Sequence, residues 1–481
     1  MKAGHELMSF DALQQLIDRA CGEHGIPGVS VTLSEQGRHT HYCAGYANLE
    51  TKQPVTSETL FPIASSTKSF FAAAVSILAA RGILDLDEPV RTYYPELVLT
   101  DKYAEQHLTL RDMLCHRSGL PRHDVTWALN LGTMSSLEDV ARMLRTLPFR
   151  TSFRQEFRYN NMIFALAGLV AERVCGTSWA DLVREEITDK LGMKTLCFTP
   201  ADLRQQENRA CGYLRDANGP KPVPYMELVP LGPASCINAS TSELIRWLDA
   251  QMGILAPGTE QPDLAAMRVC HEIQIPNSTK STNPNIRSRA YGLGWFTDRY
   301  KDLELVYHSG IIDGFISMQF FLPSKGFAGS ILSNAGGSRL YAEVMYAALE
   351  LYLGGSIDVD TLAARLPQPP DPSIESRQPK AAKPENPLPP MDWRVYEGKY
   401  THPAYGTVTV TAGTEGLNAS IGRLSSAMEH YTLHSFYLNA GANTDIAAQF
   451  ILDFKGEVTS MEIQMEPMLK TGIQFTKNCE M

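Results

Sequence analysis

The chain has 481 residues, of which 44% are apolar and 20% are charged, and its formal net charge at pH 7 is -10. This acidic, ordinary globular composition argues against a nucleic-acid-binding surface and a basic membrane-binding patch, and no apolar run reaches the roughly 18 residues of a transmembrane helix. Residues 1–7 lack the apolar segment of a secretory signal and the nine cysteines form no C-x-x-C pair, so we expect a cytoplasmic protein with reduced thiols.

The length favours more than one domain, because single hydrophobic cores rarely grow beyond roughly 250–300 residues. In the larger N-terminal part, helices are expected at 10–21, 67–80 and 341–353, and strands at 29–33, 303–306, 316–322 and 327–332. Segment 67–80 is apolar almost all round and is followed by Gly82, as in a buried core helix with a glycine stop. Helices at both ends of a group of late antiparallel strands predict an α+β domain, an α/β/α sandwich around an antiparallel sheet.

A proline-rich segment separates this part from a tail of different character. Prolines crowd residues 366–390, which have few apolar side chains to bury and resemble an extended linker. In the tail, short strands are expected at 396–400, 406–410, 417–421, 436–438, 448–454 and 458–464, with glycines and polar clusters between them. We therefore predict a mixed domain over 1–365, a linker over 366–390 and a small all-β, barrel-like domain over 391–481.

The first candidate for chemistry is Ser65-Ser66-Thr67-Lys68, which directly precedes the predicted core helix. A serine and a lysine three residues apart share one face of a helix, and an apolar setting pushes the lysine toward its neutral form. A serine hydroxyl needs such an adjacent base to become an effective nucleophile, and a helix start favours developing negative charge. An N-capping serine with a surface lysine would give the same pattern, but the core helix favours Ser65 as nucleophile and Lys68 as its base.

The second candidate is Tyr159-Asn160-Asn161, which precedes an apolar helix expected over 162–170. A tyrosine near a cation can act as a base, and an asparagine amide can hold a substrate carbonyl and a lysine together. The Y-x-N pattern also occurs at Tyr46 and Tyr437, so the pattern alone is weak. The helix that follows favours the copy with Tyr159 as proton carrier and Asn161 as substrate-binding residue.

The third candidate is His308-Ser309-Gly310, at the end of a predicted strand and shortly before another. A hydrogen-bonding side chain, a small hydroxyl and a glycine on a strand edge can line an acyl site. The backbone N–H of Ile311 could join that of Ser65 as an oxyanion hole. A rival triplet, Lys470-Thr471-Gly472, lies beyond the proline-rich segment, where we expect two residues of a strand followed by a turn instead.

The order S-x-x-K, Y-x-N, H-S-G resembles that of the serine β-lactamase and penicillin-binding superfamily. Its tyrosine version is similar to class C β-lactamases, D-aminopeptidases, DD-carboxypeptidases, related esterases and fungal acyltransferases. Further stretches that agree with the family are 26–29, 84–90, 114–121, 291–295 and 332–334. The resemblance spans residues 10–355, and the tail over 393–475 resembles the lipocalin-like domain appended to some members.

The resemblance implies that Ser65 attacks an acyl carbonyl, that Lys68 and Tyr159 pass its proton to the leaving group, and that water releases the acyl group. His308 stands where true β-lactamases and carboxylate-binding peptidases have a lysine. Because histidine is neutral or partly charged near pH 7, neutral esters or amides become more plausible substrates than carboxylates. The resemblance implies a small-molecule acyl substrate and no metal or other cofactor.

Two alternatives to hydrolysis of an ester, amide or D-amino-acid peptide stay open. An acyltransferase would move the acyl group from a thioester or ester to an alcohol or amine, as fungal relatives do. A non-catalytic, filament-forming protein would resemble mitochondrial relatives, although all three motifs are intact here. The acyl and leaving groups, the role of the tail and the formation of a homo-oligomer are not fixed by the sequence.

Overall fold

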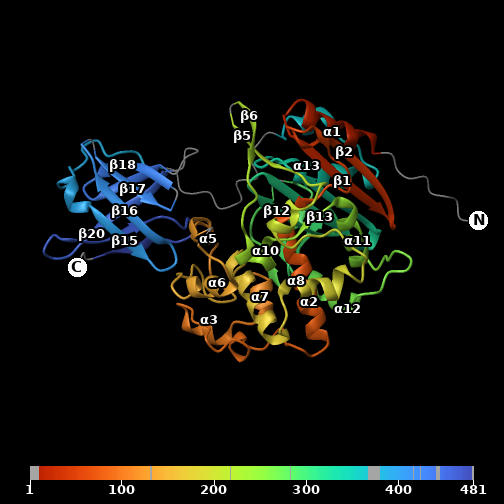
Figure 1. Cartoon of the computed structure of the whole chain (residues 1–481), viewed down its shortest axis with the longest axis horizontal. Coiled ribbons are helices and arrows are strands. Elements are labelled where there is room, and N and C mark those ends of the chain that lie inside the picture. Colours follow the sequence, from red (N-terminus) through yellow and green to blue (C-terminus); the bar gives the residue numbers. More distant parts are fainter. Residues whose placement is uncertain are drawn as a thin grey trace, which may run out of the picture. The chain divides into compact units, whose positions relative to one another are not determined.

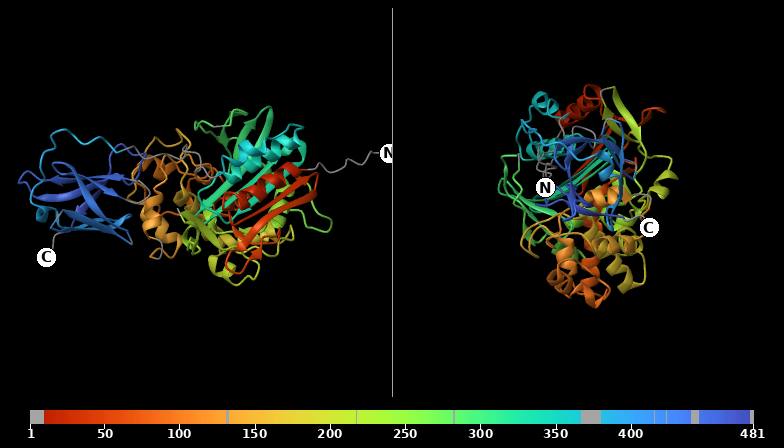
Figure 2. Two further views of the ribbon diagram at one scale, coloured as in Figure 1. Left: turned by 90° about the horizontal axis from the view of Figure 1, so that it is seen from above. Right: turned by 90° about the vertical axis from the view of Figure 1, so that its left-hand side faces the viewer.

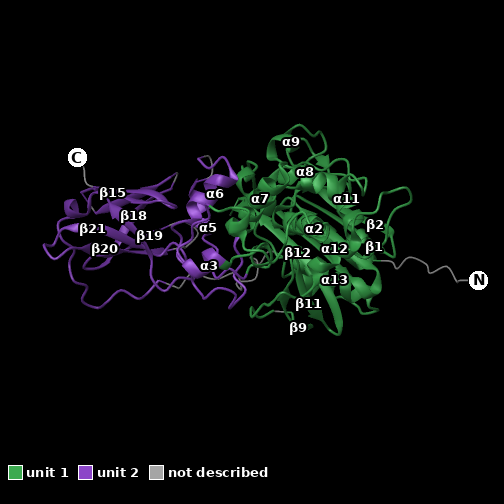
Figure 3. Ribbon diagram, turned by 90° about the horizontal axis from the view of Figure 1, so that it is seen from below, with its two compact units in different colours: residues 1–95, 107–116, 162–373 green, residues 96–106, 117–161, 374–481 purple. Residues whose placement is uncertain are grey.

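The computed structural model describes residues 10–130, 133–216, 218–281, 283–366, 380–414, 416–422, 424–439 and 445–478. It divides into two compact units (Figure 3): residues 1–95, 107–116 and 162–373 form the first, and residues 96–106, 117–161 and 374–481 form the second. The predicted linker falls largely on residues 367–379, which lie outside the described residues. The predicted domain boundaries therefore stay a prediction.

The first unit is built around an antiparallel sheet in the order β3-β2-β1-β14-β13-β12-β11-β10-β8, with β9 also paired to β11. Val29 of β1 lies opposite Ser333 of β14, so the sheet joins the early strands to the late ones. The strands are β1 Gly28–Glu35, β2 Arg38–Asn48, β3 Gln53–Pro54, β8 Ile275–Pro276, β9 Ile286–Ser288, β10 Ala290–Tyr291, β11 Phe296–Tyr300, β12 Leu303–Ile312, β13 Phe315–Leu322 and β14 Phe327–Ser333.

Helices cover both faces of this sheet (Figure 1). On one face, α1 (Asp11–Gly22) and α13 (Leu340–Tyr352) pack against each other and against the strands. On the other face, α11 (Thr241–Gln251) packs on β1, β13 and β14, and its Trp247 stacks on Phe70 of α2 (Thr67–Ala80) with ring centroids 4.2 Å apart. Covered on both faces, β13 and β14 are buried along their whole length. The predicted α+β fold is confirmed.

The remaining elements are short. The first unit also contains two small strand pairs and further helices: β4 Phe61–Pro62 with β7 Asn238–Ala239, β5 Gly212–Asp216 with β6 Gly219–Val223, α4 Leu110–Leu114, α7 Asn161–Cys175 except its first residue, α8 Trp179–Val183, α9 Pro200–Arg204, α10 Gly232–Ser235, α12 Leu264–Arg268 and α14 Val359–Ala363. The second unit contains α3 Lys102–His107, α5 Asp124–Asn130 and α6 Leu137–Leu144. Helix α6 begins with a capping box between Ser136 and Asp139, which satisfies free backbone N–H groups of its first turn.

The tail of the second unit forms a closed antiparallel barrel of strands β15 to β22, which can be followed in both views of Figure 2. Buried residues alternate with more exposed ones along β16 and β17, as they do when one face of a strand lines a core. The predicted barrel-like domain is confirmed. Its strands are β15 Gly398–His402, β16 Gly406–Ala412, β17 Leu417–Ile421, β18 Leu424–Thr432, β19 Ser435–Asn439, β20 Asp445–Leu452, β21 Val458–Ile463 and β22 Ile473–Lys477.

Among the described residues, no single helix has both the length and the apolar composition needed to cross a membrane. One pair of helices, Asn161–Cys175 and Trp179–Thr188, meets those requirements together but is bent by 84°.

Candidate active site

Ser65 lies in a single 3₁₀ turn, Ala64–Ser66, that leads directly into α2. Ala64 has a φ of 46°, a left-handed conformation that is strained for a residue with a Cβ and that neighbouring structure must hold in place. Ala64 and Ser66 are buried, whereas Ser65 between them is half-buried. The turn therefore presents the Ser65 hydroxyl at the positive end of a long apolar helix.

Lys68 is fully buried one helical turn further along. Its Nζ donates hydrogen bonds to Ser65 Oγ at 3.2 Å and to the carbonyl oxygen of Ala234 at 2.9 Å. It also lies 5.3 Å from the centre of the Phe164 ring. The structure thus brings the predicted nucleophile and its predicted base into direct contact in an apolar setting.

Strand β12 lies against the same turn. Strand β11 pairs with β12 from Leu303 to Tyr307, and His308-Ser309-Gly310 follows on the same strand. A Cβ added to Gly310 would lie 2.0 Å from the carbonyl oxygen of Ile63 and 2.9 Å from the backbone nitrogen of Ser65. This close approach of two backbones requires glycine. The predicted H-S-G motif and Ser65 therefore belong to one site.

Both ring nitrogens of His308 have partners within this site. Nδ1 lies 2.7 Å from the carbonyl oxygen of Ser309, which can only accept, so Nδ1 carries the proton. Nε2 then accepts the hydrogen bond from the Tyr291 hydroxyl at 3.0 Å. Burial lowers the pKa of His308 to about 3, and Lys68 acts in the same direction whenever its amine is protonated. His308 is therefore a neutral ring near pH 7.

Polar side chains of β13 hold the Ser65 turn by hydrogen bonds. Ser317 Oγ donates to the carbonyl oxygen of Ile63 at 2.7 Å and lies 2.8 Å from Ser66 Oγ. Gln319 Nε2 donates to the carbonyl oxygen of Ser66 at 2.9 Å and to Ser69 Oγ at 2.7 Å. Ser317 and Gln319 were not predicted as site residues, although two polar residues on the same face of an otherwise apolar strand were a readable signal.

Tyr159 and Asn161 belong to the second unit, where Tyr159 contacts the loop before α5 and Asn161 contacts the first residue of α5. The guanidinium carbon of Arg122 lies 4.9 Å from the centre of the Tyr159 ring. Asn161 Nδ2 donates to Asp124 Oδ1 at 3.2 Å. Asp124 also accepts from Arg122 Nε at 2.7 Å. Arg122 and Asp124 were not predicted, because nothing in their local sequence marks a contact with a motif about 35 residues later.

Two predicted site residues, Ser309 and Ile311, lie beside Gly310, whereas the rival K-T-G triplet lies in the barrel. Ser309 and Ile311 are half-buried on β12 next to Gly310, and the oxyanion role of the Ile311 N–H stays a prediction. The rival triplet beginning at Lys470 lies in the barrel, in the connection between β21 and β22. Among the described residues, no group of three or more His, Cys, Asp or Glu side chains is arranged to hold a metal ion.

Comparison with known proteins identifies the family. The β-lactamase family model matches residues 13–353, and a domain of unknown function, DUF3471, matches residues 382–477. An unguisins hydrolase from Aspergillus campestris is 27% identical over 423 residues, covering 83% of this chain and 76% of that protein.

Two solved structures are similar in fold. The octameric penicillin-binding protein homologue from Pyrococcus abyssi aligns with a TM-score of 0.63 at 21% identity, over 98% of this chain and 100% of that chain. The D-amino acid amidase from Ochrobactrum anthropi aligns with a TM-score of 0.61 at 24% identity, over 72% of this chain and 99% of that chain. With the family model covering most of the chain and the S-x-x-K pair in contact, this chain belongs to the β-lactamase family.

Proposed function

We propose that this chain is a serine hydrolase that forms an acyl-enzyme on Ser65 and cleaves an ester, an amide or a D-amino-acid peptide. The observation that carries the proposal is the 3.2 Å hydrogen bond between Lys68 Nζ and Ser65 Oγ, made by a fully buried lysine at the start of an apolar helix. Membership of the β-lactamase family supports serine hydrolase activity in general.

In the acylation step, Ser65 Oγ attacks the substrate carbonyl carbon while its proton moves to the neutral amine of Lys68. Backbone N–H groups of Ser65 and Ile311 stabilise the negative oxygen that develops. The bond to the leaving group then breaks, and the proton from Ser65 reaches the leaving group by way of Lys68 and Tyr159. Asn161 holds the substrate amide or carbonyl during this step.

In the second step, the leaving group has departed and a water molecule takes its position next to the acyl carbonyl. Tyr159 or Lys68 accepts one proton of this water as its oxygen attacks the acyl carbonyl. The bond between the carbonyl carbon and Ser65 Oγ breaks, and the proton returns to Ser65. The products are a carboxylic acid and the free enzyme. An alcohol or amine that replaces water would give acyl transfer instead.

The neutral state of His308 bears on the substrate. A neutral imidazole whose two nitrogens already have partners offers no positive charge to a substrate carboxylate. This favours neutral esters and amides. The names of the relatives, an unguisins hydrolase and a D-amino acid amidase, support hydrolysis rather than acyl transfer.

The test is intact-mass spectrometry of the full chain after mixing with a fluorophosphonate, activated esters, thioesters, β-lactams and D-amino acid amides. Ser65→Ala is run alongside, and Ser76→Ala serves as the matched control. Ser76 lies on the same helix and contacts Cys270 instead of the Ser65 turn. We expect one adduct on wild type and on Ser76→Ala, and none on Ser65→Ala.

An adduct of equal yield on Ser65→Ala would contradict the proposal. Substrates whose adducts form and then clear would identify the acyl group. Adding an alcohol or amine acceptor then distinguishes the two reactions, because only an acyltransferase would form the acceptor ester or amide faster than free acid.

A further inference from the structure

The segment Pro121-Arg122-His123-Asp124, which leads into α5 and is called the 121–124 segment below, contacts each residue of Tyr159-Asn160-Asn161. Arg122 lies over the Tyr159 ring, Asp124 accepts from Asn161 Nδ2, and the carbonyl oxygen of Pro121 accepts from Asn160 Nδ2. Asp124 is fixed further by Trp127 Nε1, which donates to it at 2.8 Å. Within the second unit, one short segment thus contacts all three residues of the Y-x-N motif.

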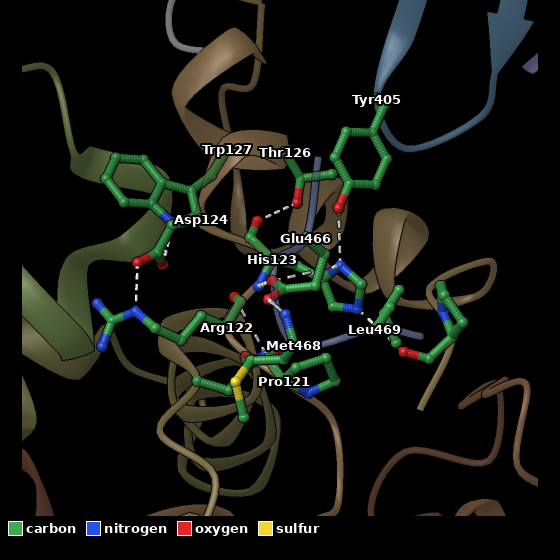
Figure 4. Close-up of polar contacts among 12 residues, drawn as sticks. Pro121, Arg122, His123, Asp124, Thr126, Trp127, Tyr405, Glu466, Met468 and Leu469 are labelled. Atoms are coloured by element: carbon green, nitrogen blue, oxygen red, sulfur yellow. Dashed lines mark hydrogen bonds and ion pairs between the residues drawn. The ribbon is translucent and has the colours of Figure 1, made fainter. Parts of the chain in front are cut away.

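On its other side, the same segment is held by two residues of the barrel (Figure 4). Tyr405, in the turn between β15 and β16, places its hydroxyl 2.7 Å from His123 Nδ1. Glu466, just after β21, accepts the backbone N–H of His123 at 2.6 Å. His123, Tyr405 and Glu466 are 0%, 1% and 2% exposed, so these contacts form a buried junction.

The chemistry of this junction is specific. His123 Nε2 lies 3.0 Å from the carbonyl oxygen of Pro148, so it donates, and Nδ1 accepts from the Tyr405 hydroxyl. Burial lowers the pKa of His123 to about 4, which keeps the ring neutral and able to accept. The second oxygen of Glu466 accepts the backbone N–H of Met468 at 3.1 Å. Both carboxylate oxygens are therefore engaged with backbone N–H groups.

The backbone of His123 shows why the junction is needed. Its φ is 49°, in the left-handed region that a residue with a Cβ adopts only when its surroundings impose it. The hydrogen bonds from Tyr405 and to Glu466 act on this same residue. If they are weakened, His123 can relax to an ordinary conformation, and its neighbours Arg122 and Asp124 will shift with it.

From these contacts we infer that Tyr405 and Glu466 of the barrel are positioning residues for Tyr159 and Asn161, acting through the 121–124 segment. The inference rests on the proposed function, in which Tyr159 carries a proton and Asn161 binds substrate. By this inference, the barrel, which matches the domain of unknown function DUF3471, contributes to catalysis by positioning Tyr159 and Asn161.

The experiment compares the turnover of an activated ester by the full-length variants Tyr405→Phe and Glu466→Gln. Tyr405→Phe removes only the hydroxyl, and Glu466→Gln leaves one acceptor for two N–H groups. The matched control is Glu462→Gln, because Glu462 also accepts a backbone N–H, that of Gly472, but within the barrel itself. Asp124→Asn tests the next link, since it keeps an acceptor for Asn161 but loses the charge that binds Arg122.

We expect kcat per titrated active site to fall at least fivefold in Tyr405→Phe, Glu466→Gln and Asp124→Asn, because Tyr159 is displaced, and KM to rise, because Asn161 is displaced with it. Glu462→Gln should match wild type in both constants. A merely structural role would only lower the fraction of folded enzyme, which leaves KM and kcat per titrated active site unchanged, so active-site titration and circular dichroism are measured in parallel. If Glu466→Gln does not fold, Tyr405→Phe decides.

Two failures are distinguishable when Tyr159→Phe is measured in the same series. If Tyr159→Phe loses turnover but the two barrel variants behave like Glu462→Gln, the inference is wrong and the proposed function stands. If all barrel variants, including Glu462→Gln, lose turnover equally, the inference is also wrong, because the effect is general loosening. Wild-type turnover in Tyr159→Phe would instead overturn the proposed role of Tyr159.

Discussion

The Tyr291 hydroxyl lies 3.0 Å from Nε2 of His308, and this contact joins β10 to the H-S-G motif of β12. The pKa of His308, lowered to about 3 by burial, keeps the ring neutral from pH 5 to pH 8. We therefore expect the ratio of kcat/KM between wild type and His308→Gln to stay constant over this range. Parallel pH profiles check this, and a ratio that changes with a midpoint near the ordinary histidine pKa would contradict it.

The same lowered pKa predicts a specific acid sensitivity. The unfolded chain binds a proton on residue 308 below the ordinary pKa of 6.5, whereas the folded chain does so only near 3. As the pH falls through this window, the unfolding free energy of wild type should fall relative to His308→Gln by up to roughly 1.4 kcal/mol per pH unit. Denaturant melts at pH 7 and pH 4.5 measure the difference. Carboxyl groups such as Glu243, with a raised pKa, occur in both proteins and cancel.

Gly310 gives a prediction about backbone contact. Alanine at this position would place a Cβ 2.0 Å from the carbonyl oxygen of Ile63, so β12 must move away from the Ser65 turn. We expect Gly310→Ala to lower kcat by about 100-fold and the unfolding free energy by about 1–3 kcal/mol. Gly22→Ala is the control, because a Cβ there meets nothing within 4 Å. Equal activity of the two variants would show that β12 is not part of the site.

The parts of the fold that the sequence predicted best are those with strong local patterns. The core helix was predicted over the same residues that α2 occupies, because its apolar character is continuous and Gly82 ends it. Strands β18 and β22 of the barrel were missed. Strand β18 has Met428 as its single buried residue among the nine from Leu424 to Thr432, so it lacks the alternation that would mark it.

In the candidate site, too, local contacts could be predicted from the sequence and long-range contacts could not. Ser65 and Lys68 are three residues apart on one helix, so their contact follows from local geometry. Ser317 is 251 residues from Ser66, and Tyr405 is 282 residues from His123. A local pattern can mark a polar residue such as Ser317, but its partner depends on sheet register and barrel packing, which a single sequence does not reveal.

Lys68 allows activity and stability to be separated. Lys68→Met keeps the length of the side chain, removes the proton carrier and places an apolar group in an apolar setting. We expect turnover to fall by at least about 1,000-fold. The melting temperature should not fall, because the relief of a buried amine offsets the hydrogen bond lost by Ala234, about 1 kcal/mol. Activity above one tenth of wild type would exclude Lys68 as the base.

The literal K-T-G triplet of the barrel tests whether motif spelling or position decides function. Lys470 is exposed in the connection between β21 and β22, whereas His308 is buried beside Tyr291. If His308-Ser309-Gly310 is the third motif, Lys470→Ala should leave kcat and KM unchanged and His308→Ala should lower kcat at least tenfold. Steady-state kinetics of the two variants on one ester decide between them. A large loss of kcat in Lys470→Ala without loss of fold would show that Lys470-Thr471-Gly472, and not His308-Ser309-Gly310, is the third motif of the active site.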